Sequence, residues 1–275
     1  MKRLTQYAVL LLLVGAAASV GQTQQLEEFR QSAHTPQPEE PKPAKRRRSF
    51  YDCEDDPFDD LKAMVVFGVL AAPYYLPYAA FDQPGCDRFE SYAAEQRQIA
   101  YKDTNWFCNS TNVVASARAQ VDYGTDFSGL EQIGTKLQVD LPVWRLTLDG
   151  SISSYYEQLA AGGEDHLAIG DANLVFRFAQ GERIVWRSGV GMNWLADTHN
   201  EAGFNFTYGL DAMPWEPVVF STEIDLGTLG HERLLRSRTT LGLQWREVEV
   251  YTGYEYVEAG SAGLSTMLFG VRGWW

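Results

Sequence analysis

Apolar and polar residues alternate strictly along the last part of the chain. Met267, Phe269 and Val271 fall on one face of this segment, and Thr266 and Arg272 fall on the other. A period of two predicts a β-strand with two unlike faces. The same alternation recurs about nine more times between residues 113 and 256, with short connections between the segments. The sequence therefore predicts an antiparallel, all-β domain over residues 113–275.

The placement of aromatic residues separates a membrane barrel from a soluble one. On the apolar face they collect at the two ends of the strands. One predicted rim carries Trp144, Phe178, Trp186, Trp245 and Trp275, and the other carries Tyr123, Trp194, Phe204 and Tyr256. Aromatic rings favour the headgroup level of a bilayer, so two girdles are expected of a barrel that crosses it. Tight links also alternate with longer ones, as periplasmic turns alternate with outer loops.

The predicted fold is thus an antiparallel up-and-down transmembrane β-barrel of about ten strands, with a disordered linker and a short helical segment before it. Its apolar face meets lipid and its polar face lines the lumen. The alternative is a soluble periplasmic ligand-binding β-barrel, in which the faces are inverted and the aromatic side chains line a pocket.

The first residues have the pattern of a signal peptide, which we place at 1–22. Lys2 and Arg3 precede an apolar run from Ala8 to Ala16, and small residues follow at a cleavage site. The run is too short to span a bilayer, which needs about 20 apolar residues. Residues 23–60 are rich in Gln, Glu and Pro and are predicted to be a disordered linker.

Residues 61–112 are predicted to be a periplasmic segment that is partly helical and partly irregular. The stretch from Leu61 to Phe81 approaches the length of a membrane span, but Pro73 and Pro77 lack backbone donors that a helix needs. We expect a short helix that ends near Ala72. An irregular aromatic turn would follow it, on the periplasmic leaflet or under the barrel mouth.

The charge and the cysteines narrow the function classes. A net charge of −13 argues against nucleic acid as a partner, because phosphate binding needs a basic face. Cys53, Cys86 and Cys108 all precede the strands, and export would place them in an oxidising compartment. We expect one disulfide, with Cys86–Cys108 as the first choice, although spacing alone does not fix the pairing. No metal site and no cofactor are expected, since the spacing matches no zinc pattern.

Over residues 113–275 the chain resembles the small bacterial outer-membrane β-barrel class, on its repeated alternation and its terminal aromatic strand. Gly170 to Phe178, Gly191 to Asp197 and Asp225 to His231 also resemble a family of uncharacterised exported bacterial proteins, which implies no activity. The resemblance to the class implies the outer membrane of a Gram-negative-type bacterium, with both termini periplasmic. It also implies two partners: outer-membrane lipid, and the barrel-assembly machinery, which would bind the C-terminal strand ending in Trp275.

The polar face of the predicted strands carries charges of both signs, which suits a narrow lumen filled by ion pairs. The predicted lumen charge network consists of Arg118, Lys136, Arg145, Asp149, Asp171, Arg177, Arg187, Glu223, Asp225, Arg236, Arg238, Glu249, Glu255 and Arg272.

Catalytic chemistry has little support in the sequence. His166, His199 and His231 fall on predicted outer loops beside acidic residues, and Ser154 and Ser261 are the candidate nucleophiles. A nucleophile needs a base within hydrogen-bond reach, and no motif ties these serines to a histidine. We therefore assign no catalytic residue and interpret these histidines as solvated loop residues.

The resulting order of functions follows from barrel size. Barrels of about eight to ten strands are filled by side chains, while open channels need more strands. A structural, anchoring or surface-binding barrel ranks first. A narrow porin-like channel for small solutes ranks second, and an outer-leaflet lipid-modifying enzyme that uses loop His and Ser ranks third.

Overall fold

The computed structural model describes residues 24–34, 71–82, 116–141, 144–159, 162–181, 183–197, 200–230 and 232–274. The signal peptide at 1–22, the three cysteines and Trp275 lie outside these residues, so the predictions for them are untested. No helix in the described ranges is long and apolar enough to cross a membrane.

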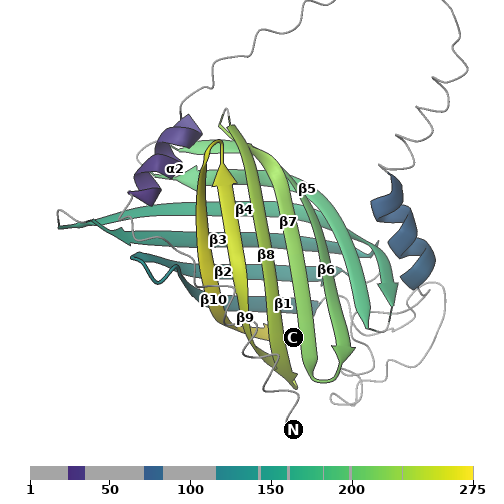
Figure 1. Cartoon of the computed structure of the whole chain (residues 1–275). Coiled ribbons are helices and arrows are strands. Elements are labelled where there is room, and N and C mark those ends of the chain that lie inside the picture. Colours follow the sequence, from purple (N-terminus) through teal and green to yellow (C-terminus); the bar gives the residue numbers. More distant parts are fainter. Residues whose placement is uncertain are drawn as a thin grey trace, which may run out of the picture.

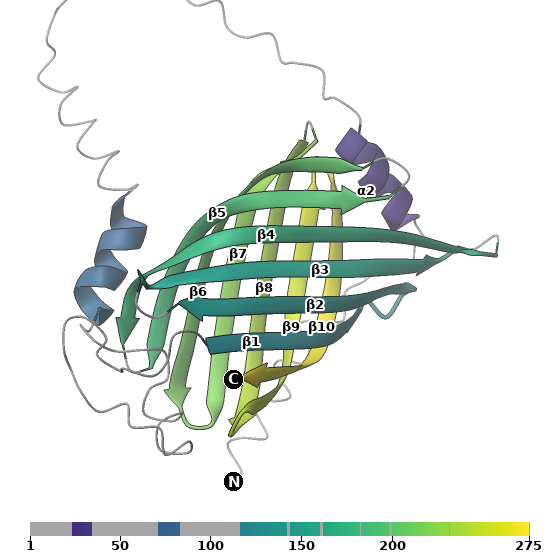
Figure 2. The same ribbon diagram turned by 180° about the vertical axis from the view of Figure 1, so that it is seen from behind.

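Ten strands form one closed antiparallel barrel, which confirms the predicted fold (Figures 1 and 2). Each strand pairs with its neighbours in sequence, and β1 pairs with β10 to close the ring. The strands are β1 (Ser116–Thr125), β2 (Leu130–Leu141), β3 (Leu146–Gln158), β4 (Glu164–Gly181), β5 (Ile184–Ala196), β6 (Glu201–Trp215), β7 (Val218–Leu229), β8 (Glu232–Trp245), β9 (Val248–Ala259) and β10 (Ala262–Trp274).

The two faces of the barrel wall are as the alternation predicts, with apolar side chains outside and charged side chains inside. In β2, Leu137 is 53% exposed on the outer face, whereas its neighbour Gln138 is 1% exposed in the lumen. On the same outer face, Leu148 of β3 pairs with Leu174 of β4, and both side chains are also exposed. This inside-out distribution is that of a barrel surrounded by lipid.

The two ends of the barrel differ. We call one the Trp274 end, because β10 finishes there and β1 begins there. We call the other the α2 end, after helix α2 (Gln25–His34), which lies across it (Figure 1). The connections are short at both ends, and the longest, between β3 and β4, has five residues, 159–163. The predicted long outer loops are therefore wrong in extent, because β3 and β4 stay paired as far as Gln158 and Glu164.

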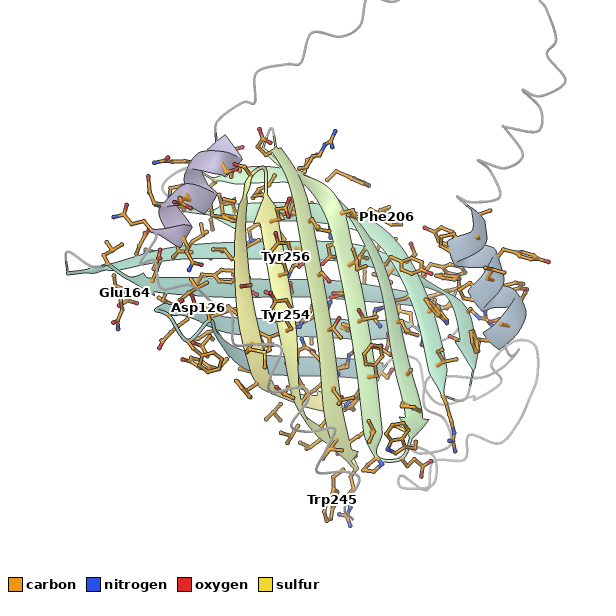
Figure 3. The ribbon with its side chains drawn as sticks, viewed as in Figure 1. Asp126, Glu164, Phe206, Trp245, Tyr254 and Tyr256 are labelled. Carbon is orange, nitrogen blue, oxygen red and sulfur yellow. The ribbon has the colours of Figure 1, made fainter. Side chains whose placement is uncertain are left out.

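Exposed aromatic side chains gather at both ends. Trp144, Trp215 and Trp245 are exposed at the Trp274 end, and Figure 3 shows Trp245 projecting there. Tyr123 and Phe204 are exposed at the α2 end. These positions give the wall two aromatic rims with an apolar band between them, which matches the girdles of outer-membrane barrels.

Two helical segments precede the barrel and correct two predictions. The prediction of a disordered linker over 23–60 is wrong for Gln25–His34, which form α2. The expectation of a helix that ends near Ala72 is also wrong. Residues 71–81 are helical through both prolines and lie beside the outer wall at the Trp274 end, as the blue helix in Figure 1 shows.

Candidate functional site: the filled lumen and its capped mouth

Inward-facing positions of nine strands, all except β6, bring most of the predicted network into the lumen. The residues buried there are Arg118, Lys136, Asp149, Asp171, Arg177, Arg187, Glu223, Asp225, Arg236, Arg238, Glu249, Glu255 and Arg272. Buried charges have to be paired, and the pairs that these residues form decide whether the lumen is open.

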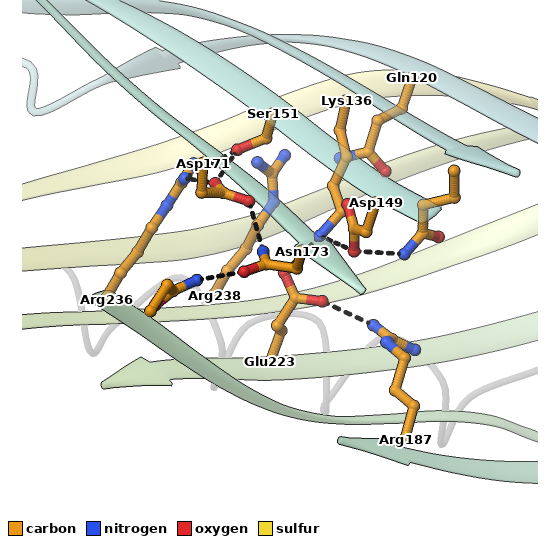
Figure 4. Close-up of polar contacts among 12 residues, drawn as sticks. Gln120, Lys136, Asp149, Ser151, Asp171, Asn173, Arg187, Glu223, Arg236 and Arg238 are labelled. Carbon is orange, nitrogen blue, oxygen red and sulfur yellow. Dashed lines mark hydrogen bonds and ion pairs between the residues drawn. The ribbon is translucent and has the colours of Figure 1, made fainter. Parts of the chain in front are cut away.

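Two ion pairs cross the whole lumen. Arg118 on β1 lies 3.4 Å from Asp211 on β6, and Lys136 on β2 contacts Glu223 on β7. In a ring of ten strands, β1 and β6 are five places apart in either direction, and so are β2 and β7. These pairs therefore join opposite walls of the barrel. Arg187 links the two ion pairs, because it contacts Asp211 and also donates to Glu223. The distance from Arg187 Nη2 to Glu223 Oε2 is 3.0 Å (Figure 4).

Glu255 on β9 is the centre of a second cluster nearer the α2 end. Its Oε2 accepts from Arg236 at 3.1 Å and from Arg238 at 3.2 Å. Its Oε1 accepts from the Gln132 amide and the Tyr155 hydroxyl, both at 2.7 Å. A carboxylate has about four lone-pair sites, so all of its acceptor capacity is used.

Arg236 extends this cluster across the barrel from β8. Its Nη1 donates to Asp171 on β4 and to Ser151 on β3, both at 3.0 Å (Figure 4). Lys136 also lies 2.9 Å from Asp149, which ties the same region to β2. Asp225 is buried in the lumen as well, and its Oδ1 has no hydrogen-bond partner among the described residues.

A third cluster fills the lumen toward the Trp274 end. Arg272 on β10 donates from one nitrogen to both oxygens of Glu249, each at 2.9 Å, and its guanidinium lies 4.7 Å from the ring centre of Tyr251. Arg118 lies 5.0 Å from the ring centre of Trp274. These guanidinium groups and aromatic rings lie against one another inside the lumen at this end.

Arg145 is the one predicted network residue that the structure places elsewhere. It stands between β2 and β3 with a left-handed φ of 52°, so it leaves the alternation that would have turned it inward. Its Nη1 donates to Asp82 at 2.8 Å, at the rim of the Trp274 end. The prediction of a lumen position for Arg145 is wrong, because a turn interrupts the strand periodicity there.

Asp211 joins two arginines in the lumen but was not predicted. The alternation along β6 could have identified it. The apolar residues Phe206, Tyr208 and Leu210 point outward, so the neighbouring Asp211 points inward.

Helix α2 closes the barrel mouth at the α2 end with apolar side chains. Leu26, Phe29 and Ala33 are fully buried, at 0%, 0% and 1% exposure. They pack into one cluster with inward-facing residues of strands around the ring: Leu130, Tyr155, Leu167, Ile169, Leu195, Leu229, Leu234, Val257, Ala259 and Leu264. The lumen thus has an apolar layer directly beneath α2 and the charged clusters below that layer.

Polar contacts hold α2 at this position. Its first turn is capped by Glu157 of β3, whose two oxygens accept from the backbone N–H groups of Gln25 and Leu26, both at 2.9 Å. These N–H groups have no partner within the helix, so a carboxylate is favoured there. Arg30 donates to both oxygens of Asp165, at 2.9 and 3.2 Å, and contacts Asp197.

At this mouth, hydrogen bonds stabilise the charged forms of Arg30 and Asp126. The hydrogen bonds from Arg30 to Asp165 and Asp197 raise the pKa of the guanidinium above its ordinary value, against the effect of burial. Asp126, in the turn after β1, is also shifted. Burial raises the pKa of its carboxyl, but hydrogen bonds from Ser128, Leu130 and Gln25 outweigh this and leave the pKa below its ordinary value.

The predicted loop chemistry finds no assembled site. His166 is exposed at the start of β4, and no contact with Ser154 or Ser261 is seen in the described part of the chain. Ser261 instead binds Ser32 of α2 through its backbone N–H, at 2.9 Å. His199 and His231 lie outside the described residues. No cluster suited to a metal ion occurs in the described ranges.

Comparisons with known proteins were made on sequence and on structure. No protein-family model matches the sequence, and no curated protein matches it. Among solved structures, the chain is similar to the outer membrane protein Ail of Yersinia pestis, with a TM-score of 0.31, 12% identity, and coverage of 58% of this chain and 99% of that one.

Two further solved structures have comparable values. The beta domain of the Bordetella autotransporter BrkA has a TM-score of 0.34 and 10% identity, over 58% of this chain and 99% of that one. The KdgM porin has a TM-score of 0.26 and 10% identity, over 57% and 98%. The architecture rests on the chain's own geometry, which is that of a small outer-membrane barrel: closed, antiparallel, apolar outside and charged inside.

Proposed function

We propose that the protein is a closed outer-membrane barrel with a structural role, anchoring the segments that precede β1 at the membrane and presenting the α2 end as a binding surface. The observation that carries this proposal is the pair of ionic contacts, Arg118 with Asp211 and Lys136 with Glu223, that join opposite walls of the lumen. A solute path along the barrel axis would have to break them. Breaking a buried ion pair costs about 3–5 kcal/mol.

The mouth gives independent support for a closed barrel. A solute that arrived at the α2 end would meet Leu26 and Phe29 before it reached the charged clusters. Both the apolar layer and the ionic layers would have to open in series, and no single side-chain rotation accomplishes that.

The experiment that tests this proposal is conductance across planar lipid bilayers. Wild-type protein, refolded and inserted, should give no discrete current steps at moderate voltage. Insertion is verified separately by the difference in gel mobility between unheated and boiled samples, which folded membrane barrels show. Discrete steps from inserted wild-type protein would contradict the closed barrel and favour the narrow porin-like channel.

Orientation belongs to the same proposal. We place the Trp274 end in the periplasm, because three of its four connections have only two residues, and periplasmic turns are the shorter ones in this class. Helix α2 then lies at the cell surface, so the segment between residues 34 and 71 joins the two sides of the membrane. This differs from the expectation that everything before the barrel is periplasmic. A labelled cysteine at Gln31, on the exposed face of α2, should react with a membrane-impermeant reagent on intact cells; reaction only after cell disruption would reverse the orientation.

Outer-membrane lipid is the first proposed partner and the barrel-assembly machinery is the second. The lipid-facing residues Met267, Phe269 and Val271 of β10 lead to Trp275, the terminal aromatic residue that this machinery would recognise. Deleting Trp275 should lower the amount of assembled barrel in cells while leaving refolding in detergent unchanged. Equal losses in both settings would indicate a structural role for Trp275 instead.

A further inference from the structure

The helix over residues 71–81 has a composition that suits neither water nor the barrel lumen. Its eleven residues are Ala, Pro, Tyr, Leu and Phe, and none carries a charge. Its large side chains are exposed: Tyr74, Tyr75, Leu76, Tyr78 and Phe81. A contiguous exposed apolar surface on a protein marks a place where something other than water covers it.

One side of this helix packs on the lipid-facing wall of the barrel. The Tyr74 ring lies 5.1 Å from the Phe178 ring of β4 and 5.9 Å from the Tyr208 ring of β6, and its hydroxyl lies 3.2 Å from Ser188 Oγ of β5. Phe178 points outward from the wall, yet it is only 8% exposed. The helix thus covers part of the aromatic rim at the Trp274 end, beside Trp186.

A specific hydrogen bond compensates for Pro77, one of the two prolines that were expected to break this helix. Pro77 has no N–H, so the carbonyl of Pro73, four residues earlier, receives no hydrogen bond from within the helix. The Tyr208 hydroxyl of β6 donates to that carbonyl at 2.6 Å. A lipid-facing side chain of the barrel therefore replaces the donor that Pro77 lacks.

The end of the helix is attached to the rim of the barrel. Asp82 accepts from Arg145 Nη1 at 2.8 Å and from the backbone N–H of Gln180 at 3.1 Å. These contacts lie at the start of β3 and the end of β4, so they set the height of the helix at the level of the rim. Polar attachment at the rim and apolar contact along the wall together orient the helix against the barrel.

We propose that the helix over residues 71–81, attached to the rim through Asp82, binds the headgroup layer of the membrane leaflet at the Trp274 end. This rests on the proposed membrane location. The exposed apolar side is continuous with the lipid-facing band, and tyrosine rings favour the headgroup level. The eleven described helical residues extend about 16 Å at about 1.5 Å per residue, about half of a hydrocarbon core of about 30 Å.

Lipid is the occupant that the composition favours over a second copy of the chain. The exposed side offers only apolar surface and tyrosine hydroxyls, which suit the boundary between acyl chains and headgroups, where interfacial helices bury about 5–10 Å of depth. Contact between copies through this helix would instead displace lipid from the rim.

Depth-dependent fluorescence quenching in vesicles tests the proposal. A fluorescent amino acid replaces Leu76, which is 62% exposed on the helix, or Leu137, which is 53% exposed on the wall of β2 far from the helix. Each inserted barrel is measured in phosphatidylcholine vesicles whose lipids carry a nitroxide near the headgroup or near the end of the acyl chain. We expect the Leu76 probe to be quenched several-fold more by the shallow nitroxide than by the deep one, and the Leu137 probe to be quenched strongly by the deep one.

The matched pair separates the two proposals. Quenching of Leu137 without quenching of Leu76 would overturn the interfacial helix and leave the membrane barrel in place. Quenching of neither probe in a folded sample would overturn the membrane location itself. A Leu76 probe that is shielded from lipid and transfers energy between labelled copies would overturn lipid as the occupant and indicate a second copy of the chain.

Discussion

The two helical segments described before the barrel lie in opposite surroundings. Helix α2 has ten residues, several of them charged, and it packs its apolar side into the barrel mouth. The 71–81 helix has no charged residue and packs on the outer wall. The difference teaches that an inside-out barrel offers two kinds of docking surface, and that the composition of a short helix matches the one it uses.

The largest expected effect comes from removing a buried apolar side chain on the underside of α2. Phe29→Ala should weaken the docking of α2 by about 3–5 kcal/mol, because it removes a fully buried ring and leaves a cavity. The measurement is amide hydrogen exchange in α2 relative to the strands. Gln31→Ala, on the exposed face, serves as the control. Unchanged protection of α2 in the Phe29 variant would show that the apolar layer does not hold the helix.

A smaller effect is expected from the ionic anchor of α2. Arg30→Ala should weaken docking by about 1.5–3 kcal/mol, the range for hydrogen bonds to charged groups, since Asp165 and Asp197 lose their donor. Hydrogen exchange again reports the change. Arg30→Lys keeps the charge but loses the two-pronged contact, so it should fall between wild type and alanine. If α2 docks no more tightly in Arg30→Lys than in Arg30→Ala, the two-pronged contact of the guanidinium holds the helix and the positive charge alone does not.

The outer helix should respond to the loss of one hydroxyl. Tyr208→Phe removes the bond to the Pro73 carbonyl and should weaken docking of the 71–81 helix by about 0.5–1.5 kcal/mol. The exchange of backbone amides in residues 71–81 measures it, and α2 should be unaffected. Tyr254→Phe, on the outer face of β9, is the matched control. Equal effects from both variants would mean that the helix does not depend on this bond.

The smallest expected effect is the acid sensitivity of the α2 end. The pKa of Asp126 is lower in the folded protein than its ordinary value of 3.8, so its carboxylate stabilises the fold above that pH. This stabilisation is lost as the pH falls through the folded pKa. Asp126→Asn should therefore lower the temperature of the gel-mobility change at neutral pH, and the difference from wild type should vanish in strong acid. A difference that persists in strong acid would point to a contact other than the carboxylate.

The barrel wall could be predicted from the sequence because a strand has a period of two. Leu137 and Gln138 differ by one position and lie on opposite sides of the wall, so parity alone assigns each residue to lipid or lumen. The same rule places Arg118, Lys136 and Glu255 inside. It fails at Arg145, where a turn with positive φ ends the periodicity.

The two helices were predicted poorly because their stability comes from contacts distant in sequence. Leu26, Phe29 and Ala33 have helical spacing, but a helix of ten residues is marginal in isolation, and the apolar layer of the mouth stabilises it. The prolines of the 71–81 helix argue against a helix until Tyr208, more than a hundred residues away, supplies the missing donor.

The sequence by itself determined that this chain is an inside-out barrel of alternating strands, because each residue's side of the wall follows from local periodicity. Only the tertiary structure decided that the lumen is crossed by ion pairs, that α2 closes one mouth and that the uncharged helix lies against the outer wall. These features depend on which strands face each other across a closed ring, as Arg118 and Asp211 do. Ring closure is a property of the whole barrel and of no single segment.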